Sequence, residues 1–165
     1  MTYETLALLS QYTLKGILVD TNILLLYFVG MIRRERISRF NRTEQFTPQD
    51  YDLLIALLAD FKTVVTTPNI LTEVSSFIDK LGEPDQTSCY INFAIEIPAL
   101  QEMYIPSRDV ASTDWVFSTY GVTDCGIAEA AKNNQYLVLT DDFKAANLLR
   151  VQGVDTINFN DLRSG

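Results

Sequence analysis

Four short apolar segments, separated by stretches with helical patterns, constrain the fold of this chain most strongly. The segments cover residues 16–20, 63–66, 136–139 and 154–158. A short apolar run bounded by turn residues is typical of a strand buried in a parallel sheet. The alternation of such strands with helices predicts a three-layer α/β/α domain with a mainly parallel central sheet. Helices are expected at residues 4–12, 22–40, 109–119, 124–133 and 143–151, and in stretches that begin at Pro48, Pro68 and Pro84, the last running toward Met103.

The chain has 165 residues and contains no internal repeat and no stretch rich in Pro, Gly or Ser. This length suits one globular domain with a sizeable core. We therefore expect a single domain over residues 1–165. Within it, residues 1–15 are expected to form an N-terminal helical extension, and residues 33–61 a longer helical segment that carries a basic cluster.

Histidine is absent from the sequence, and the two cysteines, Cys89 and Cys125, have no C-x-x-C spacing. The absence of histidine excludes Ser-His-Asp and Cys-His catalysis and any zinc site with histidine ligands. The cysteine spacing argues against a redox or zinc motif. Any chemistry must therefore use carboxylates, hydroxyls, lysine or a metal ion held by oxygen atoms.

The apolar run from Ile23 to Ile32 is too short to span a bilayer. The first ten residues carry Glu4 and no basic residue, which does not resemble a secretory signal. We expect both cysteines to be buried and reduced, and the protein to be cytoplasmic without membrane association.

Acidic residues follow or flank the predicted strands at the edge where strands of a parallel sheet end. Asp20 ends the first strand, Glu73 lies in the helix after the second, Asp124 opens a helix, and Asp141 and Asp142 follow the third strand. Each acid alone could serve as a helix cap or a first-turn charge. Together they would repel one another and raise each other's pKa unless a cation neutralised them. Ligation by oxygen alone is the chemistry of Mg²⁺ or Mn²⁺.

Four segments that contain these acids resemble, in order, the acidic motifs of PIN-domain ribonucleases. The closest similarity is to the VapC-type toxins of bacterial and archaeal toxin–antitoxin pairs. The resemblance implies a PIN-like fold and a metal-dependent endoribonuclease. The four segments are Val19–Leu24, Thr67–Val74, Thr123–Ala128 and Leu137–Phe143.

The resemblance also implies roles for individual residues. Asp20, Glu73 and Asp124 match the first three acidic positions, and the fourth is either Asp142 or Asp141. The implied ligands of Mg²⁺ or Mn²⁺ are Asp20, Asp124 and Asp142, with Asn22 and Thr140 as supporting polar residues. Hydrolysis of a phosphodiester by metal-activated water needs no histidine, which agrees with the composition.

Partners follow from the same resemblance. They are an RNA substrate, a second copy of the chain in a homodimer, and an antitoxin that inserts a basic side chain among the carboxylates. The residues before the first strand and the length of the 33–61 segment depart from the compact toxin pattern. The alternative to an enzyme is a catalytically silent PIN-like module for RNA binding or assembly.

Five of the 13 basic residues lie between Arg33 and Arg42. On one helix Arg33, Arg36 and Arg39 would form a stripe, which is a candidate RNA contact. The alternatives are a solvated face, or a surface that pairs with the acidic remainder of the domain or with a partner. The net charge of −8 disfavours non-specific coating of RNA and predicts that the metal-free protein binds RNA poorly.

Overall fold

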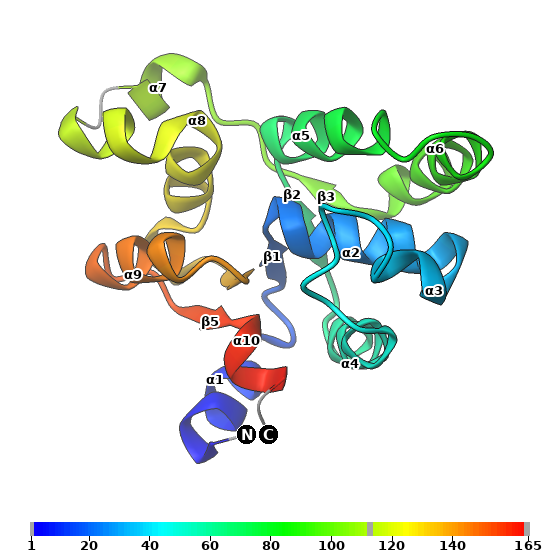
Figure 1. Ribbon diagram of the computed structural model, residues 1–165. Coiled ribbons are helices and arrows are strands. Elements are labelled where there is room, and N and C mark those ends of the chain that lie inside the picture. The colour runs from blue at the N-terminus through cyan, green and yellow to red at the C-terminus, as the bar shows by residue number, and fades with distance from the viewer. Residues whose placement is uncertain (1, 112–113, 164–165) are drawn as a thin grey trace.

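The computed structural model describes residues 2–111 and 114–163 and contains a five-stranded sheet (Figure 1). The strand order is β3-β2-β1-β4-β5, and all four pairings are parallel. This confirms the predicted α/β class and parallel sheet. The strands are β1 (Ile17–Val19), β2 (Val64–Thr66), β3 (Gln101–Glu102), β4 (Leu137–Thr140) and β5 (Thr156–Asn158).

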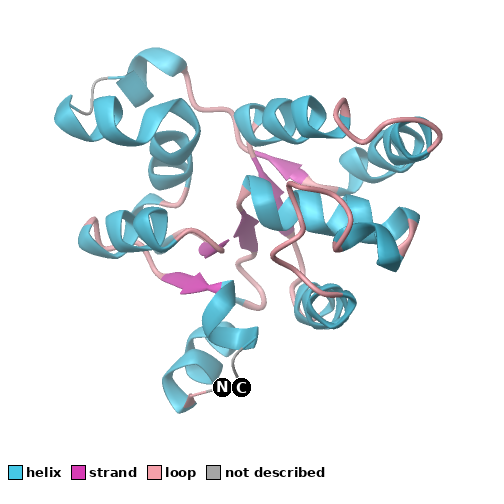
Figure 2. Ribbon diagram, viewed as in Figure 1, coloured by secondary structure: helices cyan, strands magenta, loops and turns pink. Residues whose placement is uncertain are grey.

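Helices cover both faces of the sheet (Figures 1 and 2). Helices α2 (Thr21–Ile32) and α4 (Pro48–Ala59) lie on one side, and α8 (Asp114–Ala130) and α9 (Phe143–Val151) lie on the other. The remaining helices are α1 (Tyr3–Tyr12), α3 (Arg34–Ile37), α5 (Pro68–Ile78), α6 (Asp85–Glu96), α7 (Ser107–Ala111) and α10 (Phe159–Arg163), with 3₁₀ turns at Ile97–Ala99 and Lys132–Asn134.

Helix α2 is the centre of the core. Most of its side chains are buried, including the run from Ile23 to Leu26, and it packs against α4, α5 and α6. A helix that is apolar on all sides must be enclosed in this way. Within the described ranges, no helix is long and apolar enough to cross a membrane.

The prediction of one helix over residues 22–40 was wrong. Helix α2 ends at Ile32, Arg33 is extended (φ −160°, ψ 129°), and α3 begins at Arg34. The break turns the chain so that Ile37 and Phe40 enter the core, where both are buried. Hydrophobic burial therefore decides where this helix stops.

Two further differences concern segments with weak local patterns. Strand β3 was not predicted, because both of its residues are exposed and carry no apolar pattern. The helix predicted at 109–119 includes residues 112–113, which lie outside the described residues. Gly121, the predicted end of that helix, is a non-helical residue (φ 79°) within α8, so the chain changes direction there before Asp124.

Gly30 allows α2 and α4 to approach closely. A Cβ atom at this position would lie 2.2 Å from Cδ2 of the Tyr51 ring. We predict that Gly30→Ala lowers the free energy of unfolding by about 1–3 kcal/mol, because the added methyl group forces the helices apart. Urea denaturation measures this change.

The matched control is Gly126→Ala in α8, where the added Cβ would have its nearest contact at 3.6 Å, to Nδ2 of Asn69. This variant should be neutral or more stable by up to about 1 kcal/mol, since alanine favours helix. Equal urea midpoints for Gly30→Ala and the parent protein would show that α2 and α4 do not need this close approach.

Candidate active site at the carboxyl ends of the strands

The order in which the chain adds strands to the sheet changes direction between the neighbouring strands β1 and β4. From β1 the chain proceeds to β2 and then to β3 on one side, and it later returns to β4 and β5 on the other. Open parallel sheets bind ligands outside the carboxyl ends of the strands at such a switch point. Asp20 directly follows β1 and Asp141 directly follows β4, so both predicted acids lie at this position.

Asp20 is fixed by two short hydrogen bonds. It is the N-cap of α2, where Oδ1 accepts from the Thr21 backbone N–H at 2.6 Å, and Oδ2 accepts from Oγ1 of Thr140 at 2.6 Å. The side chain is buried, and burial raises the pKa of Asp20 to about 6. The two hydrogen bonds lower this pKa, whereas the negative charges of Asp141 and Glu73 raise it.

Glu73 is held between two threonine hydroxyl groups. Oγ1 of Thr21 donates to Oε2 at 2.9 Å, and Oγ1 of Thr123 donates to Oε1 at 2.6 Å. The carboxylate therefore links α2, α5 and α8. The sequence reasoning missed both threonines. The available signal was their position, because Thr21 follows Asp20 directly and Thr123 precedes Asp124 directly.

Asp124 approaches this group from α8. Burial, followed by the negative charges of Asp20, Asp142 and Glu73, raises the pKa of Asp124 to about 7, and Lys144 lowers it. Asp20, Asp124 and Thr140 also border a narrow, mainly apolar gap that has no room for a water molecule. The structure therefore brings the first three predicted acids together from three separate helices.

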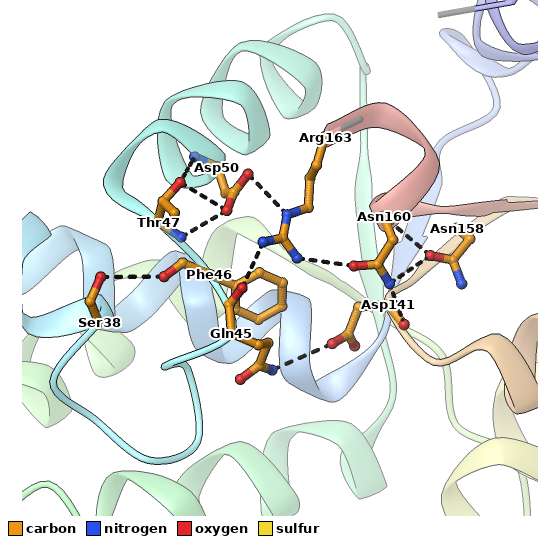
Figure 3. Close-up of polar contacts among 9 residues, drawn as sticks. All are labelled: Ser38, Gln45, Phe46, Thr47, Asp50, Asp141, Asn158, Asn160 and Arg163. Carbon is orange, nitrogen blue, oxygen red and sulfur yellow. Dashed lines mark hydrogen bonds and ion pairs between the residues drawn. The ribbon is translucent and has the colours of Figure 1, made fainter. Parts of the chain in front are cut away.

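Asp141 and Asp142 have different surroundings. Asp141 accepts hydrogen bonds from Asn22 at 3.1 Å and from Gln45 at 3.5 Å, the latter drawn in Figure 3. Burial raises the pKa of Asp141. Asp142 is exposed and caps α9, with Oδ1 accepting from the N–H groups of Lys144 and Ala145 at 2.6 and 3.1 Å. The predicted supporting residue Thr140 joins the two sides of the site, because it donates to Asp20 and accepts from the Asp142 N–H at 3.1 Å.

Residues from two distant segments surround Asp141 (Figure 3). Gln45 comes from the turns before α4, and Asn160 of α10 donates from Nδ2 to the Asp141 backbone carbonyl at 2.7 Å. Arg163 connects the two segments by donating to the Gln45 carbonyl at 2.6 Å and to Oδ1 of Asn160 at 3.0 Å. No sequence motif indicated these three residues.

The arginine stripe predicted on one helix does not form, because α2 ends before it. Arg33 and Arg36 both pair with Asp85 of α6, at 2.6 and 2.9 Å, and Arg36 also donates to the Leu81 carbonyl at 2.6 Å. Arg39 lies beyond α3 and is exposed. For Arg33 and Arg36 the structure therefore has the alternative arrangement, in which the arginines pair with the acidic remainder of the domain.

The donor set at the strand ends is suited to a hard divalent cation, because it consists of carboxylates whose mutual repulsion Lys144 only partly offsets. Among the described residues, no group of three or more Asp, Glu or Cys side chains is arranged to hold one ion. Mg²⁺ commonly uses only one or two protein carboxylates and keeps several water ligands. Asp20 and Asp124 are the pair best placed to act in this way, because Asp20 is the first of the acids whose charge raises the Asp124 pKa.

A scan of the chain against protein-family models gives no match, and a search of curated proteins gives none either. The similarity to PIN-domain ribonucleases therefore rests on the four sequence segments named above. The gathering of Glu73 and Asp124 around Asp20, at the carboxyl end of β1, is an independent, geometric observation about this chain.

The raised pKa values of Asp20 and Asp124 predict an unusual pH dependence of stability. Both exceed the ordinary value of 3.8, so the folded protein retains protons that the unfolded chain has lost between about pH 4 and pH 7. The stability contributed by these two groups falls as the pH rises through that window. In the absence of divalent metal, Asp124→Asn should therefore be more stable than the parent at about pH 8 and nearly equal to it at about pH 5.

Urea denaturation in EDTA at the two pH values measures the difference. Asp60→Asn is the control, because Asp60 is exposed at the end of α4, away from the acidic group. It should leave the pH dependence unchanged. A constant stability difference between Asp124→Asn and the parent at both pH values would contradict the raised pKa.

Proposed function

We propose that this protein is a divalent-metal-dependent endoribonuclease of the PIN type. The observation that carries the proposal is the convergence of Asp20, Glu73 and Asp124 with the Asp141–Asp142 pair at the switch point of the sheet. The charges of Asp141 and Glu73 act on Asp20, and those of Asp20, Asp142 and Glu73 act on Asp124. Such repulsion destabilises the folded chain and is typical of a site that binds a cation or a substrate. The resemblance of the four segments to PIN-domain motifs supplies the reaction class.

In this proposal Asp20 and Asp124 are the principal metal ligands. Thr140 and the Thr21 N–H orient the Asp20 carboxylate, so its position is set before any ion arrives. A bound Mg²⁺ or Mn²⁺ would supply an activated water and neutralise charge on the phosphate oxygens. Glu73, clamped by Thr21 and Thr123, is placed to orient the attacking water by accepting one of its protons in a hydrogen bond.

The two candidates for the fourth acid receive different roles. Asp142 is assigned to the part of the site beside Asp124, because its charge is among those that raise the Asp124 pKa. The capping hydrogen bonds of α9 hold its Oδ1. Asp141 is assigned to the part of the site beside Asp20, because its charge is among those that raise the Asp20 pKa. Hydrogen bonds from Asn22 and Gln45 hold its carboxylate there. We propose Asp142 as the metal-side acid and Asp141 as an outer acid that orients Asn22.

The arrangement of the carboxylates also supports a second candidate function. Because no three acids among the described residues are arranged around one point, a PIN-like RNA-binding or assembly module without catalysis is the competing proposal. The two proposals differ in their response to metal, because only a site that takes up the ion gains stability from it.

We predict that the protein cleaves single-stranded RNA in Mn²⁺ or Mg²⁺, and that Asp20→Asn reduces the cleavage rate by at least about 100-fold. The amide keeps the shape of the side chain but lacks the charge that attracts the ion. Gel analysis of a labelled oligoribonucleotide with purified protein measures the rate. Asp60→Asn, an equal charge change on an exposed residue, should cleave at the parental rate. Retention of full activity in Asp20→Asn would refute the assigned role.

We further predict that Mn²⁺ raises the thermal midpoint of the protein. At a Mn²⁺ concentration 100 times the Kd, the native state gains about 2.7 kcal/mol. Asp20→Asn/Asp124→Asn should lose the effect, whereas Asp60→Asn should keep it. Differential scanning fluorimetry measures all three. RNA binding by a protein whose midpoint does not respond to Mn²⁺ would favour the silent binding module.

A further inference from the structure

The segment from Ser38 to Thr47 forms an anchored edge beside the acidic site. Thr43 is buried, and its Oγ1 donates to the Ile37 carbonyl at 2.8 Å. Phe46 is also buried and packs against Phe159 with ring centroids 6.1 Å apart. Gln45 reaches Asp141, so this end of the segment contacts the site directly (Figure 3).

Arg42, in the middle of this segment, stacks on an aromatic ring of α5. The guanidinium carbon lies 4.7 Å from the centroid of the Phe77 ring, and Nζ of Lys80 lies 5.3 Å from the same centroid. Arg42 and Lys80 are both exposed, whereas Phe77 is partly buried. The ring therefore holds two cations at the surface while their charged groups remain accessible to solvent.

The position of Phe77 places these cations about one helical turn beyond Glu73 along α5. Glu73 and Phe77 are four residues apart in α5, so their side chains are neighbours on one face of the helix. One helical turn, about 5.4 Å, separates their levels along the axis.

The charges of Arg42 and Lys80 are not neutralised by nearby acids. Among the residues that the structure describes, neither makes an ion pair, unlike Arg33, Arg34 and Arg36. Asp79, the acid next to Lys80, accepts instead from Tyr90 at 2.7 Å and from Gln86 at 3.3 Å. Two uncompensated cations at the edge of a carboxylate group form a site for an anion that extends beyond the metal centre.

We propose that Arg42 and Lys80, held against Phe77, bind a backbone phosphate of the substrate strand that neighbours the phosphate at the acidic site. This inference rests on the proposed nuclease function and assigns the path of the strand, which passes from the acids over Glu73 and Phe77. Phosphate contacts carry no base information, so RNA and DNA strands should use the subsite alike.

The test measures binding of fluorescein-labelled oligouridine by fluorescence anisotropy over a range of KCl concentrations, with Ca²⁺ in place of Mn²⁺ to slow cleavage. Arg42→Gln/Lys80→Gln should bind about 10-fold more weakly or worse. The slope of log affinity against log salt should fall by about 0.7 for each phosphate that the variant no longer neutralises. Labelled oligothymidylate should show the same decrease.

Arg34→Gln/Lys62→Gln is the matched control. It removes the same charges, and Arg34 also stacks on an aromatic ring, with its guanidinium carbon 5.9 Å from the Tyr51 centroid, but it pairs with Asp52. Lys62 precedes β2, at the opposite end of the sheet from the acids. Binding and salt slope should stay at parental values. Arg42→Lys should bind nearly as well as the parent, because the charge is kept. Thermal midpoints of all variants identify any loss of folding.

Cleavage assays in Mn²⁺ distinguish a failure of the proposed subsite from a failure of the proposed nuclease function. Arg42→Gln/Lys80→Gln should raise KM with little change in kcat, because the contact is made equally before and during the reaction. Parental affinity, salt slope and KM in this variant, with active parent enzyme, would overturn the subsite alone. A parent protein that neither cleaves nor binds the oligonucleotide would overturn the nuclease proposal and the subsite together.

Discussion

The carboxylate of Asp20 is held by two hydrogen bonds at the point where β1 passes into α2, and the rest of the site is arranged around it. The hydrogen bond from the Thr21 N–H caps the buried helix α2. The hydrogen bond from Thr140 joins the start of α2 to the end of β4. Thr140 and Thr21 thus give the charge of Asp20 partial compensation in a place that water hardly reaches. Loss of this carboxylate would disturb the fold and the site through the same two contacts.

The acids around Asp20 work against the stability of the fold. Threonine hydroxyl groups donate hydrogen bonds to the carboxylates of Glu73 and Asp20. These groups carry no positive charge that could cancel the repulsion among the carboxylates. Lys144 alone opposes the charge of Asp124 among the influences on its pKa. A core designed only for stability would place an arginine or an apolar side chain here. In the function proposed above, a bound cation would supply the missing positive charge.

The parts of this fold that were predictable from sequence are those set by local patterns. The bounds of α9, Phe143–Val151, agree with the prediction, because an aspartate cap and an apolar face define that helix locally. The acids at the strand ends were predictable for the same reason. The end of α2 was not, because it depends on the burial of Ile37 and Phe40 in the core of the folded domain. The pairing of Arg33 and Arg36 with Asp85, some fifty residues further along the chain, is equally non-local. Likewise, Gln45 and Asn160 reach Asp141 only through tertiary packing, which no spacing in the sequence records.

The electrostatics of the arginine-rich segment depend on pairing as well as composition. Arg34 pairs with Asp52, and Arg33 and Arg36 share Asp85, so much of the positive charge between Arg33 and Arg42 is already neutralised within the fold. Among the described residues, Arg39 and Arg42 make no ion pair. A protein with a net charge of −8 cannot attract a polyanion through its overall field. The proposed function therefore requires cations close to the acids, and Arg42, held against Phe77 one helical turn from Glu73, meets that condition, whereas Arg33 and Arg36 pair with Asp85.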